Sequence, residues 1–420
     1  MKIIIRKATV INPQREYHHK TVDIYVKDGI IEAIGDNLKV NSDVAEIAID
    51  DLFVSPGWFD SSVSFGEPGF EDRETISNGL QVAAKSGFTS VALQPNMNPV
   101  ADNQSAISFL TTKSSGFATD LYPIGALTKG SLGQDLAELY DMKNSGAIAF
   151  GDYNKSVENA GVMKIALDYV QDFGGLVIGF CKNAQLAGNG VVNEGAVAMR
   201  LGLKGIPSIA EESEVAKNIQ LLEYTGGRIH VPTISTARSV DMIRSAKAKG
   251  LQITCSVSVH HLVLTDETLE TFDSRFKVSP PLRANEDRLA LIEGVLDGSI
   301  DMITSDHNPI DIENKKMEFA LAKNGTIGLE SAFGALMTVL PLDVIIEKLT
   351  AGKRIFGIAD SEIAAKSIAN LTLFTPSAEW VFKKENIISK SKNSAFLGRQ
   401  MKGKVHGIIN NGKLVLSDKK

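Results

Sequence analysis

The sequence predicts an α/β protein, a (β/α)₈ TIM barrel carrying a small composite β-sandwich domain. Three observations lead to this fold class. Apolar, strand-like runs alternate with amphipathic stretches about eight times over roughly 250 residues, which is the pattern of a barrel. Glycines follow the last periodic residue of several of these stretches, as they do at helix ends. Both ends of the chain are instead rich in short strands.

The two strand-rich ends predict one β domain assembled from residues 1–55 and 370–420. Asp28-Gly29 separates two apolar runs near the N-terminus, and Asn411-Gly412 separates two more near the C-terminus. Such dipeptides between β-rich runs are typical of hairpin turns. The barrel is then expected over residues 56–369.

Within the barrel, apolar β-rich runs predict the strands and the stretches of 3.6-residue period between them predict the helices. A doubly wound open sheet is the competing architecture, but no G-x-G-x-x-G follows a strand to support it. The predicted strands are Trp58–Ser64, Ser90–Leu93, Leu121–Ala126, Ala147–Asp152, Leu176–Cys181, Arg228–Ser235, Gln252–Val259 and Asp301–Asp306. The predicted helices include Ile76–Lys85, Asp135–Lys143, Val162–Val170, Glu214–Tyr224, Val240–Lys249 and Glu286–Leu296.

Composition and charge narrow the possible partners. The 420 residues carry a formal net charge of -6, which argues against nucleic acid or an anionic membrane surface as partner. No run approaches the ~18 apolar residues of a membrane span, and charge comes too early for a signal peptide. Two cysteines, Cys181 and Cys255, cannot form a disulfide framework and are expected in the core. We expect a cytoplasmic protein.

The candidate functional residues lie at the ends of the predicted strands, because the active site of a barrel sits at its C-terminal face. After the first strand, the alternation Ser62-Val63-Ser64 puts both serine side chains on one face. The ends of the other strands carry Asn96, Asp152, Phe180, Thr233, His260 with His261, and Asp306.

Several of these stretches resemble motifs of the dihydroorotases, a family of cyclic amidohydrolases. Residues 60–69 resemble their Asp-x-His-x-His-x-Arg-x-Pro-Gly, and residues 94–99 their Met-Pro-Asn-Thr-x-Pro. Residues 277–283 are similar to Lys-x-Asn-Pro-Pro-Leu-Arg, residues 305–309 to Thr-Asp-His-Ala-Pro, and residues 328–330 to Gly-x-Glu. The resemblance runs in order from about Pro56 to the C-terminal strands. It implies an amidohydrolase barrel that opens or closes a cyclic amide C–N bond in pyrimidine biosynthesis, using zinc.

The resemblance also places the family's metal ligands, and the imidazoles among them are missing. The four histidines fall on Ser62, Ser64, Phe180 and Thr233, the bridging carboxylate on Asp152, and the general base on Asp306. Zinc prefers imidazole or thiolate ligands, and a catalytic site usually offers three protein ligands. No stoichiometric zinc is therefore expected in the protein, and Asp306 would be a vestigial base.

Most of the substrate-binding residues implied by the resemblance are also replaced in this sequence. The family's carboxylate-binding arginine falls on Gly66 and its clamp asparagine on Ser279, whereas Asn96 is retained. An arginine fork holds a carboxylate bidentately, and glycine offers only a backbone amide. His307, beside Asp306, is a further candidate contact.

The remaining histidines and nearby lysines are expected to have other roles. His18-His19 is expected to be structural in a polar loop of the β domain, and His230 to pack behind its strand. His260-His261 matches a family His-His-Leu that is not a metal ligand there. Without a metal, Asp152 and Asp306 would face each other and repel, and Lys182 or Lys155 is expected to supply compensating positive charge.

The sequence thus predicts a dihydroorotase-like protein that is metal-free and catalytically impaired, with dihydroorotate neither formed nor hydrolysed above background. It would act as a homo-oligomeric, non-catalytic subunit or scaffold, for instance with aspartate transcarbamoylase. Two alternatives remain. One is an active cyclic-amide hydrolase of the dihydroorotase, hydantoinase or allantoinase type, with one metal on Asp152, Asp306 and a histidine. The other is a small-molecule sensor that uses the barrel pocket.

Overall fold

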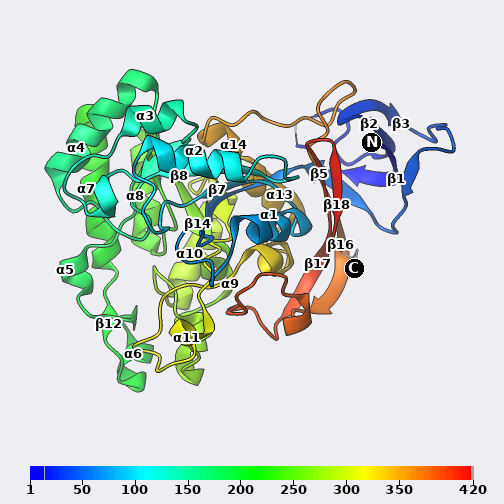
Figure 1. Cartoon of the computed structure of the whole chain (residues 1–420). Helices are drawn as coiled ribbons and strands as arrows, with labels where there is room; N and C mark the ends of the chain where they lie inside the picture. The colour runs from blue at the N-terminus through cyan, green and yellow to red at the C-terminus, as the bar shows by residue number, and fades with distance from the viewer. Residues whose placement is uncertain (14, 418–420) are drawn as a thin grey trace.

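Eight parallel strands form the barrel in the computed structural model, which describes residues 1–13 and 15–417 (Figure 1). The strands follow one another around the ring in chain order, as predicted. The ring closes where Ser64 N donates to the His307 carbonyl (2.7 Å) and His307 N donates to the Ser62 carbonyl (3.2 Å). The barrel strands are β6 Trp58–Val63, β7 Phe88–Leu93, β8 Asp120–Gly125, β9 Ala149–Gly151, β10 Val177–Ile178, β13 Ile229–Val231, β14 Ile253–Ser258 and β15 Met302–Thr304.

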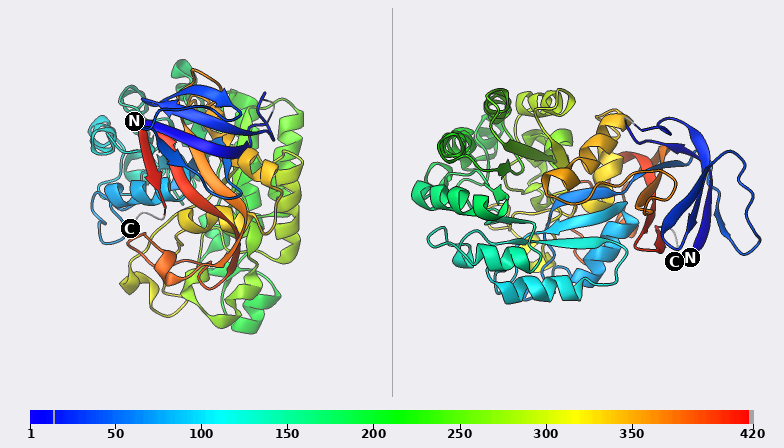
Figure 2. Two further views of the ribbon diagram at one scale, coloured as in Figure 1. Left: turned by 90° about the vertical axis from the view of Figure 1, so that its right-hand side faces the viewer. Right: turned by 90° about the horizontal axis from the view of Figure 1, so that it is seen from above.

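Helices cover the outside of the barrel, as Figure 2 shows from above. The first begins after Thr75, whose hydroxyl accepts from Asn78 N, and Gly87 follows its end with a φ of 96°. The helix predicted from Asp135 begins only at Leu139, because Lys129 N and Ala137 N make backbone hydrogen bonds between residues 127–129 and 135–137. The helices are α1 Ile76–Lys85, α2 Gln104–Lys113, α3 Leu139–Asn144, α4 Ala160–Tyr169, α5 Ala184–Ala187, α6 Ala196–Leu201, α7 Ile209–Thr225, α8 Ala237–Ala248, α9 Val259–Val263, α10 Asn285–Leu296, α11 Ile312–Lys315, α12 Ala332–Leu336, α13 Leu342–Thr350 and α14 Gly352–Ile355.

A second sheet combines strands from both ends of the chain and lies at one side of the barrel (Figures 1 and 2). Its order is β18-β17-β16-β5-β1-β2-β3, with β4 pairing to β1, so hydrogen bonds join all eight strands into one sheet. The two ends meet where β5 pairs antiparallel with β16. The strands are β1 Lys2–Val10, β2 Thr21–Lys27, β3 Ile30–Gly35, β4 Ala45–Ile47, β5 Phe53–Pro56, β16 Leu371–Val381, β17 Gln400–Asn410 and β18 Lys413–Leu416. A separate two-stranded sheet contains β11 Val192–Asn193 and β12 Gly205–Ile206.

An aromatic cluster packs the sheet onto the barrel. Trp58 at the start of β6 is fully buried, with ring centroids 5.0 Å from Phe333 and 5.7 Å from Phe374. Its indole Nε1 donates to Ser55 Oγ of β5 at 2.9 Å, so the polar edge of the ring is satisfied as well. The first barrel strand is therefore anchored to the sheet that precedes it in the chain.

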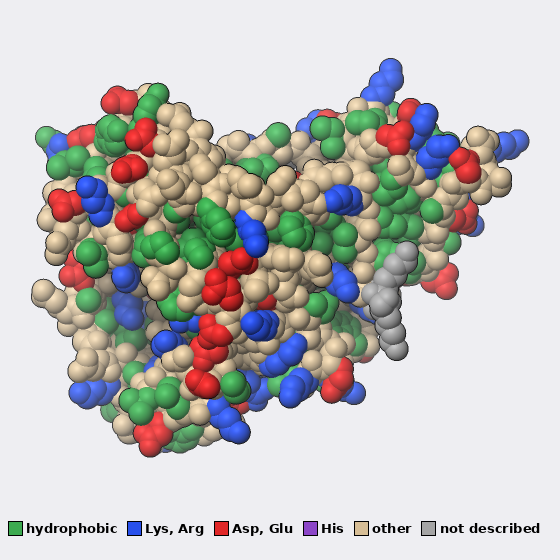
Figure 3. Space-filling model, in the orientation of Figure 1, with side chains coloured by type: hydrophobic (Ala, Val, Ile, Leu, Met, Phe, Trp, Pro, Cys, Tyr) green, Lys and Arg blue, Asp and Glu red, His purple; other side chains and the backbone are tan. Residues whose placement is uncertain are grey.

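The surface mixes charge of both signs, and Figure 3 shows lysine, arginine, aspartate and glutamate side chains spread over one face. Both cysteines are buried, as expected. Among the described residues, no helix is both long enough and apolar enough to cross a lipid bilayer.

Candidate functional site at the barrel mouth

The predicted strand ends converge at the barrel mouth. Ser62, Asp152, Phe180 and Thr233 line one small cavity, although they come from four different strands or the loops after them. Asp306 reaches the same place, since Ser62 Oγ donates to its Oδ1 at 3.0 Å. The spatial convergence expected from the strand ends is therefore present.

Two of these positions keep a strained backbone. Thr233 has a φ of 47° and Asp306 a φ of 46°. A β-branched residue is rarely found in this left-handed region, and such residues cost of order 1–3 kcal/mol. Both positions correspond by resemblance to metal ligands, an imidazole at Thr233 and the retained aspartate at Asp306.

Asp306 is buried among neutral donors. Besides the serine hydroxyl, Tyr153 OH donates to its Oδ1 at 3.4 Å. Burial raises the pKa of Asp306 to about 7, with hydrogen bonding from Ser62 opposing the rise and the charge of Asp60 adding to it. The carboxyl group is therefore poised to exchange a proton near neutral pH.

Asp152 is turned toward the preceding loop. Its Oδ1 accepts from Leu127 N (3.0 Å) and Thr128 N (3.1 Å), and its Oδ2 accepts from the Thr128 hydroxyl. Burial raises the pKa of Asp152, and these hydrogen bonds oppose the rise. The expected repulsion between Asp152 and Asp306 is wrong, because each carboxylate has its own set of donors and the charge that acts on Asp306 is that of Asp60.

Asp60 joins the first and last barrel strands. Its carboxylate accepts from Ser62 N and Ser305 N, both at 2.9 Å, and from the Thr304 hydroxyl. The side chain is fully buried, which raises its pKa against the effect of these donors. Asp60 therefore fixes the ends of β6 and β15 relative to each other.

The lysines do not supply the expected charge at the mouth. Lys155 Nζ donates to the Ser131 carbonyl at 3.1 Å instead of a carboxylate. The pKa of Lys182 is lowered by burial and then by the neighbouring Arg283, the opposite of what a carboxylate partner would do. The prediction that either lysine compensates Asp152 or Asp306 is wrong, because hydroxyl and amide donors satisfy these carboxylates.

Ser64 and Asn96 bond to each other beside the cavity. Asn96 Nδ2 lies 2.9 Å from Ser64 Oγ, and the hydroxyl lies 3.1 Å from Asn96 Oδ1. Ser279 is buried at the edge of the Lys277–Arg283 block. Gly66 has no room for a side chain, since an added Cβ would lie 2.2 Å from the Phe70 carbonyl oxygen.

His307 packs behind the mouth and does not line the cavity. Its Nδ1 accepts from Gly328 N (3.2 Å) and Leu329 N (3.4 Å), and burial lowers its pKa to about 3. Its ring lies edge-on to Phe65, at 6.2 Å between centroids. In this structure the neutral imidazole organises the backbone after β15.

The other histidines near the strands are also buried. His230 bonds through its ring nitrogens to Thr254 Oγ1 (2.9 Å) and Ser256 Oγ (3.1 Å), in agreement with its expected place behind the strand. His261 bonds to Ser258 Oγ and to the Pro281 carbonyl. Burial lowers the pKa of each of these two rings, to about 3 for His230 and about 4 for His261.

The residues at the mouth do not fit a zinc ion. Serine, threonine and phenylalanine stand at the four positions that resemble histidine ligands, and the two carboxylates are separately occupied by donors. Among the described residues, the sole group of three possible metal-ligating side chains whose donor atoms lie within 4.8 Å is His18, His19 and Asp343, not the mouth. In the part of the chain that the structure describes, Asp152, Asp306 and a histidine do not come together as such a group.

Two residues of the site were not predicted from the sequence. Tyr153 is half-buried and donates to Asp306, and burial holds its pKa well above the usual value. Gln94 lines the cavity and its Nε2 lies 3.3 Å from Ser62 Oγ. Tyr153 could have been found from the sequence, because it is a polar aromatic residue that directly follows Asp152 at the end of a predicted barrel strand.

The cavity itself is small. Its volume is about 10 Å³, which is close to the smallest space that holds one water molecule. Phe180, only 5 % exposed, occupies part of the mouth. A cyclic substrate would need this mouth to open.

Comparison with known proteins places the chain among cyclic amidohydrolases. A family model described as "Dihydro-orotase-like" matches residues 52–239. A dihydroorotase of Pelotomaculum thermopropionicum is 42% identical over 427 residues, covering 100% of this chain and 99% of the relative. A dihydroorotase of Geotalea daltonii is 40% identical over 422 residues, covering 99% of each chain.

Solved structures of the same fold are more distant in sequence. An L-hydantoinase (dihydropyrimidinase) from Arthrobacter aurescens has a TM-score of 0.86 at 20% identity, covering 100% of this chain and 96% of that one. A D-hydantoinase (dihydropyrimidinase) from Thermus sp. has a TM-score of 0.83 at 22% identity, covering 99% and 95%. These likenesses support the fold, and the predicted barrel with its separate sheet is confirmed.

Proposed function

The chain belongs to the dihydroorotase family, and from that premise we propose that it acts on a cyclic amide in pyrimidine biosynthesis through a barrel centre that uses no zinc. The observation that carries the second part is the set of side chains at the mouth: Ser62, Ser64, Phe180 and Thr233 stand where the resemblance puts imidazoles. Full-length likeness to proteins named dihydroorotase supports the first part. These names favour cyclic-amide hydrolysis over the scaffold function expected from the sequence.

Asp306 is the group that would carry chemistry in such a centre. A general acid or base works best with a pKa near the operating pH, and burial brings the pKa of Asp306 to about 7. Its position at the family's general-base residue supports the same role. Tyr153 and Ser62, the two hydroxyls that donate to it, would hold the carboxylate in place. Without zinc nothing lowers the pKa of a water molecule to about 7, so we infer an impaired hydrolase.

The closed mouth favours a second candidate function. A cavity of about 10 Å³ leaves no room for a metabolite in this conformation. That observation favours a non-catalytic subunit in a homo-oligomer or beside aspartate transcarbamoylase, and it argues against a small-molecule sensor that uses the mouth.

A turnover assay with chelator separates these candidates. We expect formation and hydrolysis of dihydroorotate at least about a thousandfold below the 1–10³ per second typical of enzymes. This turnover should be unaffected by EDTA and lost in Asp306→Asn. Asp311→Asn, a change at a helix N-cap outside the cavity, is the matched control. Turnover at an ordinary rate that EDTA abolishes would contradict the zinc-free centre. Wild-type protein with no turnover above background would support the non-catalytic subunit instead.

A further inference from the structure

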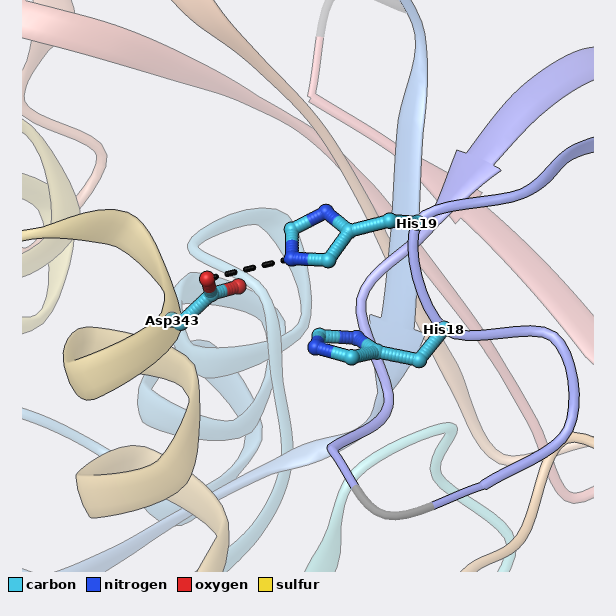
Figure 4. A group of neighbouring side chains, drawn as sticks. All are labelled: His18, His19 and Asp343. Carbon is cyan, nitrogen blue, oxygen red and sulfur yellow. Dashed lines mark hydrogen bonds and ion pairs between the residues drawn. The ribbon is translucent and has the colours of Figure 1, made fainter.

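A second constellation of ligating side chains lies between the sheet and the barrel, far from the mouth. His18 and His19 are in the loop between β1 and β2, and Asp343 is in the first turn of α13. One donor atom from each of these three side chains lies within 4.8 Å of the others. Figure 4 shows both imidazoles pointing from the loop toward the carboxylate. We call these three residues the interdomain cluster.

The loop backbone brings two consecutive side chains to the same side. In an extended strand neighbouring side chains point to opposite faces, but His19 adopts a left-handed φ of 59°. Backbone hydrogen bonds hold this turn, from His18 N to the Arg15 carbonyl (3.2 Å) and from His19 N to the Val10 carbonyl (2.7 Å). The two rings lie 3.9 Å apart between centroids. The pair is therefore presented as a unit to α13.

One carboxylate oxygen of Asp343 has no hydrogen-bond partner. His19 Nε2 lies 3.2 Å from Asp343 Oδ2, whereas the buried Oδ1 has no hydrogen-bond partner. A buried oxygen without a partner costs free energy, and a bound water or ion at this atom would remove that cost. The unpaired Asp343 Oδ1 is therefore evidence for a ligand that does not depend on the two histidines.

We propose that the interdomain cluster binds a divalent transition-metal ion, with Zn²⁺ as the best fit. Two imidazoles and one carboxylate, with one position left for water, are a ligand set that zinc uses in proteins. Zinc bonds of about 2.0–2.2 Å place tetrahedral ligand atoms roughly 3.4 Å apart. The three donor atoms therefore need to close by no more than about 1.4 Å from their 4.8 Å limit, which side-chain rotation supplies.

One existing contact opposes binding. Asn12 N donates to His18 Nδ1 at 3.3 Å, which leaves the ring proton on Nε2. Binding through Nε2 moves that proton to Nδ1 and gives up this long hydrogen bond. The ion also has a way in, because the side chains of His19 and Asp343 are 55% and 49% exposed. We therefore assign a metal site of moderate affinity that clamps the sheet to the barrel.

Zinc titration by calorimetry of the full chain, with a thermal melt at each metal level, tests the assignment. We expect one Zn²⁺ per chain and a melting temperature that rises with zinc, because the ion binds only the folded state. His18→Ala and Asp343→Asn should each weaken binding by at least about tenfold, since even losing a hydrogen-bond partner behind a ligand costs that much. The matched controls are Glu347→Gln, one turn further along α13, and His406→Gln, a histidine on β17; neither should alter binding.

Three results would overturn the assignment. The first is folded wild-type protein that takes up no stoichiometric Zn²⁺. The second is uptake that survives Asp343→Asn in a variant whose circular dichroism spectrum shows it is folded. The third is uptake lost in Asp306→Asn, which would put the ion at the barrel mouth. Co²⁺ in place of Zn²⁺ gives a second readout, because imidazole ligation changes its visible absorption, and Asp343→Asn should remove that change.

Discussion

At the scale of single residues, hydrogen bonds from neutral donors hold the carboxylates of the barrel mouth. Ser62 stands where the resemblance puts an imidazole, and its hydroxyl donates to Asp306. Thr128 does the same for Asp152, together with two backbone amides. Each carboxylate therefore has its own set of neutral donors.

The pKa of Asp306 predicts a specific pH dependence of stability. Its folded-state pKa of about 7 lies above the usual value, so the protonated side chain stabilises the fold below pH 4. This contribution is lost as pH rises from about 4 to about 7, by at most about 4 kcal/mol. Asp306→Asn cannot ionise, so we expect it to gain stability relative to the wild type across that window.

Melting temperatures of the two proteins measured from pH 4 to pH 8 check this prediction. The difference should grow in favour of Asp306→Asn as pH rises and level off above pH 7. Asp311→Asn serves as control: burial acts to raise the pKa of Asp311, but its hydrogen bonds to Asn314 and the charge of Arg73 together outweigh burial, so the pKa is lowered. Parallel curves for the wild type and Asp306→Asn would mean that Asp306 titrates in its ordinary range.

At the scale of elements, the segment between β6 and α1 is folded too tightly to hold an arginine at position 66. Phe70 N donates to the Gly66 carbonyl at 2.8 Å, and Glu67 Oε2 accepts from Ile76 N at 2.9 Å. The Arg73 guanidinium stacks on the Phe70 ring, 4.1 Å from its centroid. The departure from the family motif at Gly66 is therefore built into the fold of this loop.

Gly66→Ala should destabilise the protein by about 1–3 kcal/mol, the usual cost of overpacking. The reason is steric, since the added Cβ would lie 2.2 Å from a backbone oxygen that cannot rotate away. Gly35→Ala is the matched control, because its Cβ would meet only Leu38 Cδ2 at 3.7 Å. Urea unfolding of both variants measures the difference. Equal stability would show that residues 66–74 shift freely and that an arginine could be accommodated.

At the scale of the whole molecule, local patterns predicted the architecture but not the long-range pairs. The α1 helix has the predicted bounds, because its cap and apolar period are local. Asp60 bonding to Ser305, and His19 facing Asp343, join segments more than 240 residues apart. No periodicity or spacing connects such segments, so the structure was needed to find them. The sequence also could not predict that the Asp152 side chain turns toward Thr128, because this depends on its rotamer.

The convergence of the strand ends can be tested by restoring metal ligands. The variant combines Ser62→His, Ser64→His, Phe180→His and Thr233→His in an Asp343→Asn background, which silences the interdomain cluster. Ser62, Phe180 and Thr233 line one cavity with Asp152, so imidazoles there would join two carboxylates in a set that suits zinc. We expect zinc uptake that the Asp343→Asn parent lacks. We also expect lower stability without metal, because larger side chains enter a cavity of about 10 Å³.

Glutamine at the same four positions is the control for this variant, since it adds bulk without imidazole and should bind no zinc. Turnover of dihydroorotate should stay low even with metal bound, because the metal alone does not orient a substrate. The carboxylate clamp cannot be restored by Gly66→Arg while the Phe70 carbonyl blocks it. If the histidine variant folds, as judged by circular dichroism, and binds no more zinc than its parent, these four positions do not share a coordination sphere. The alignment of the strand ends with the family's ligands would then be wrong.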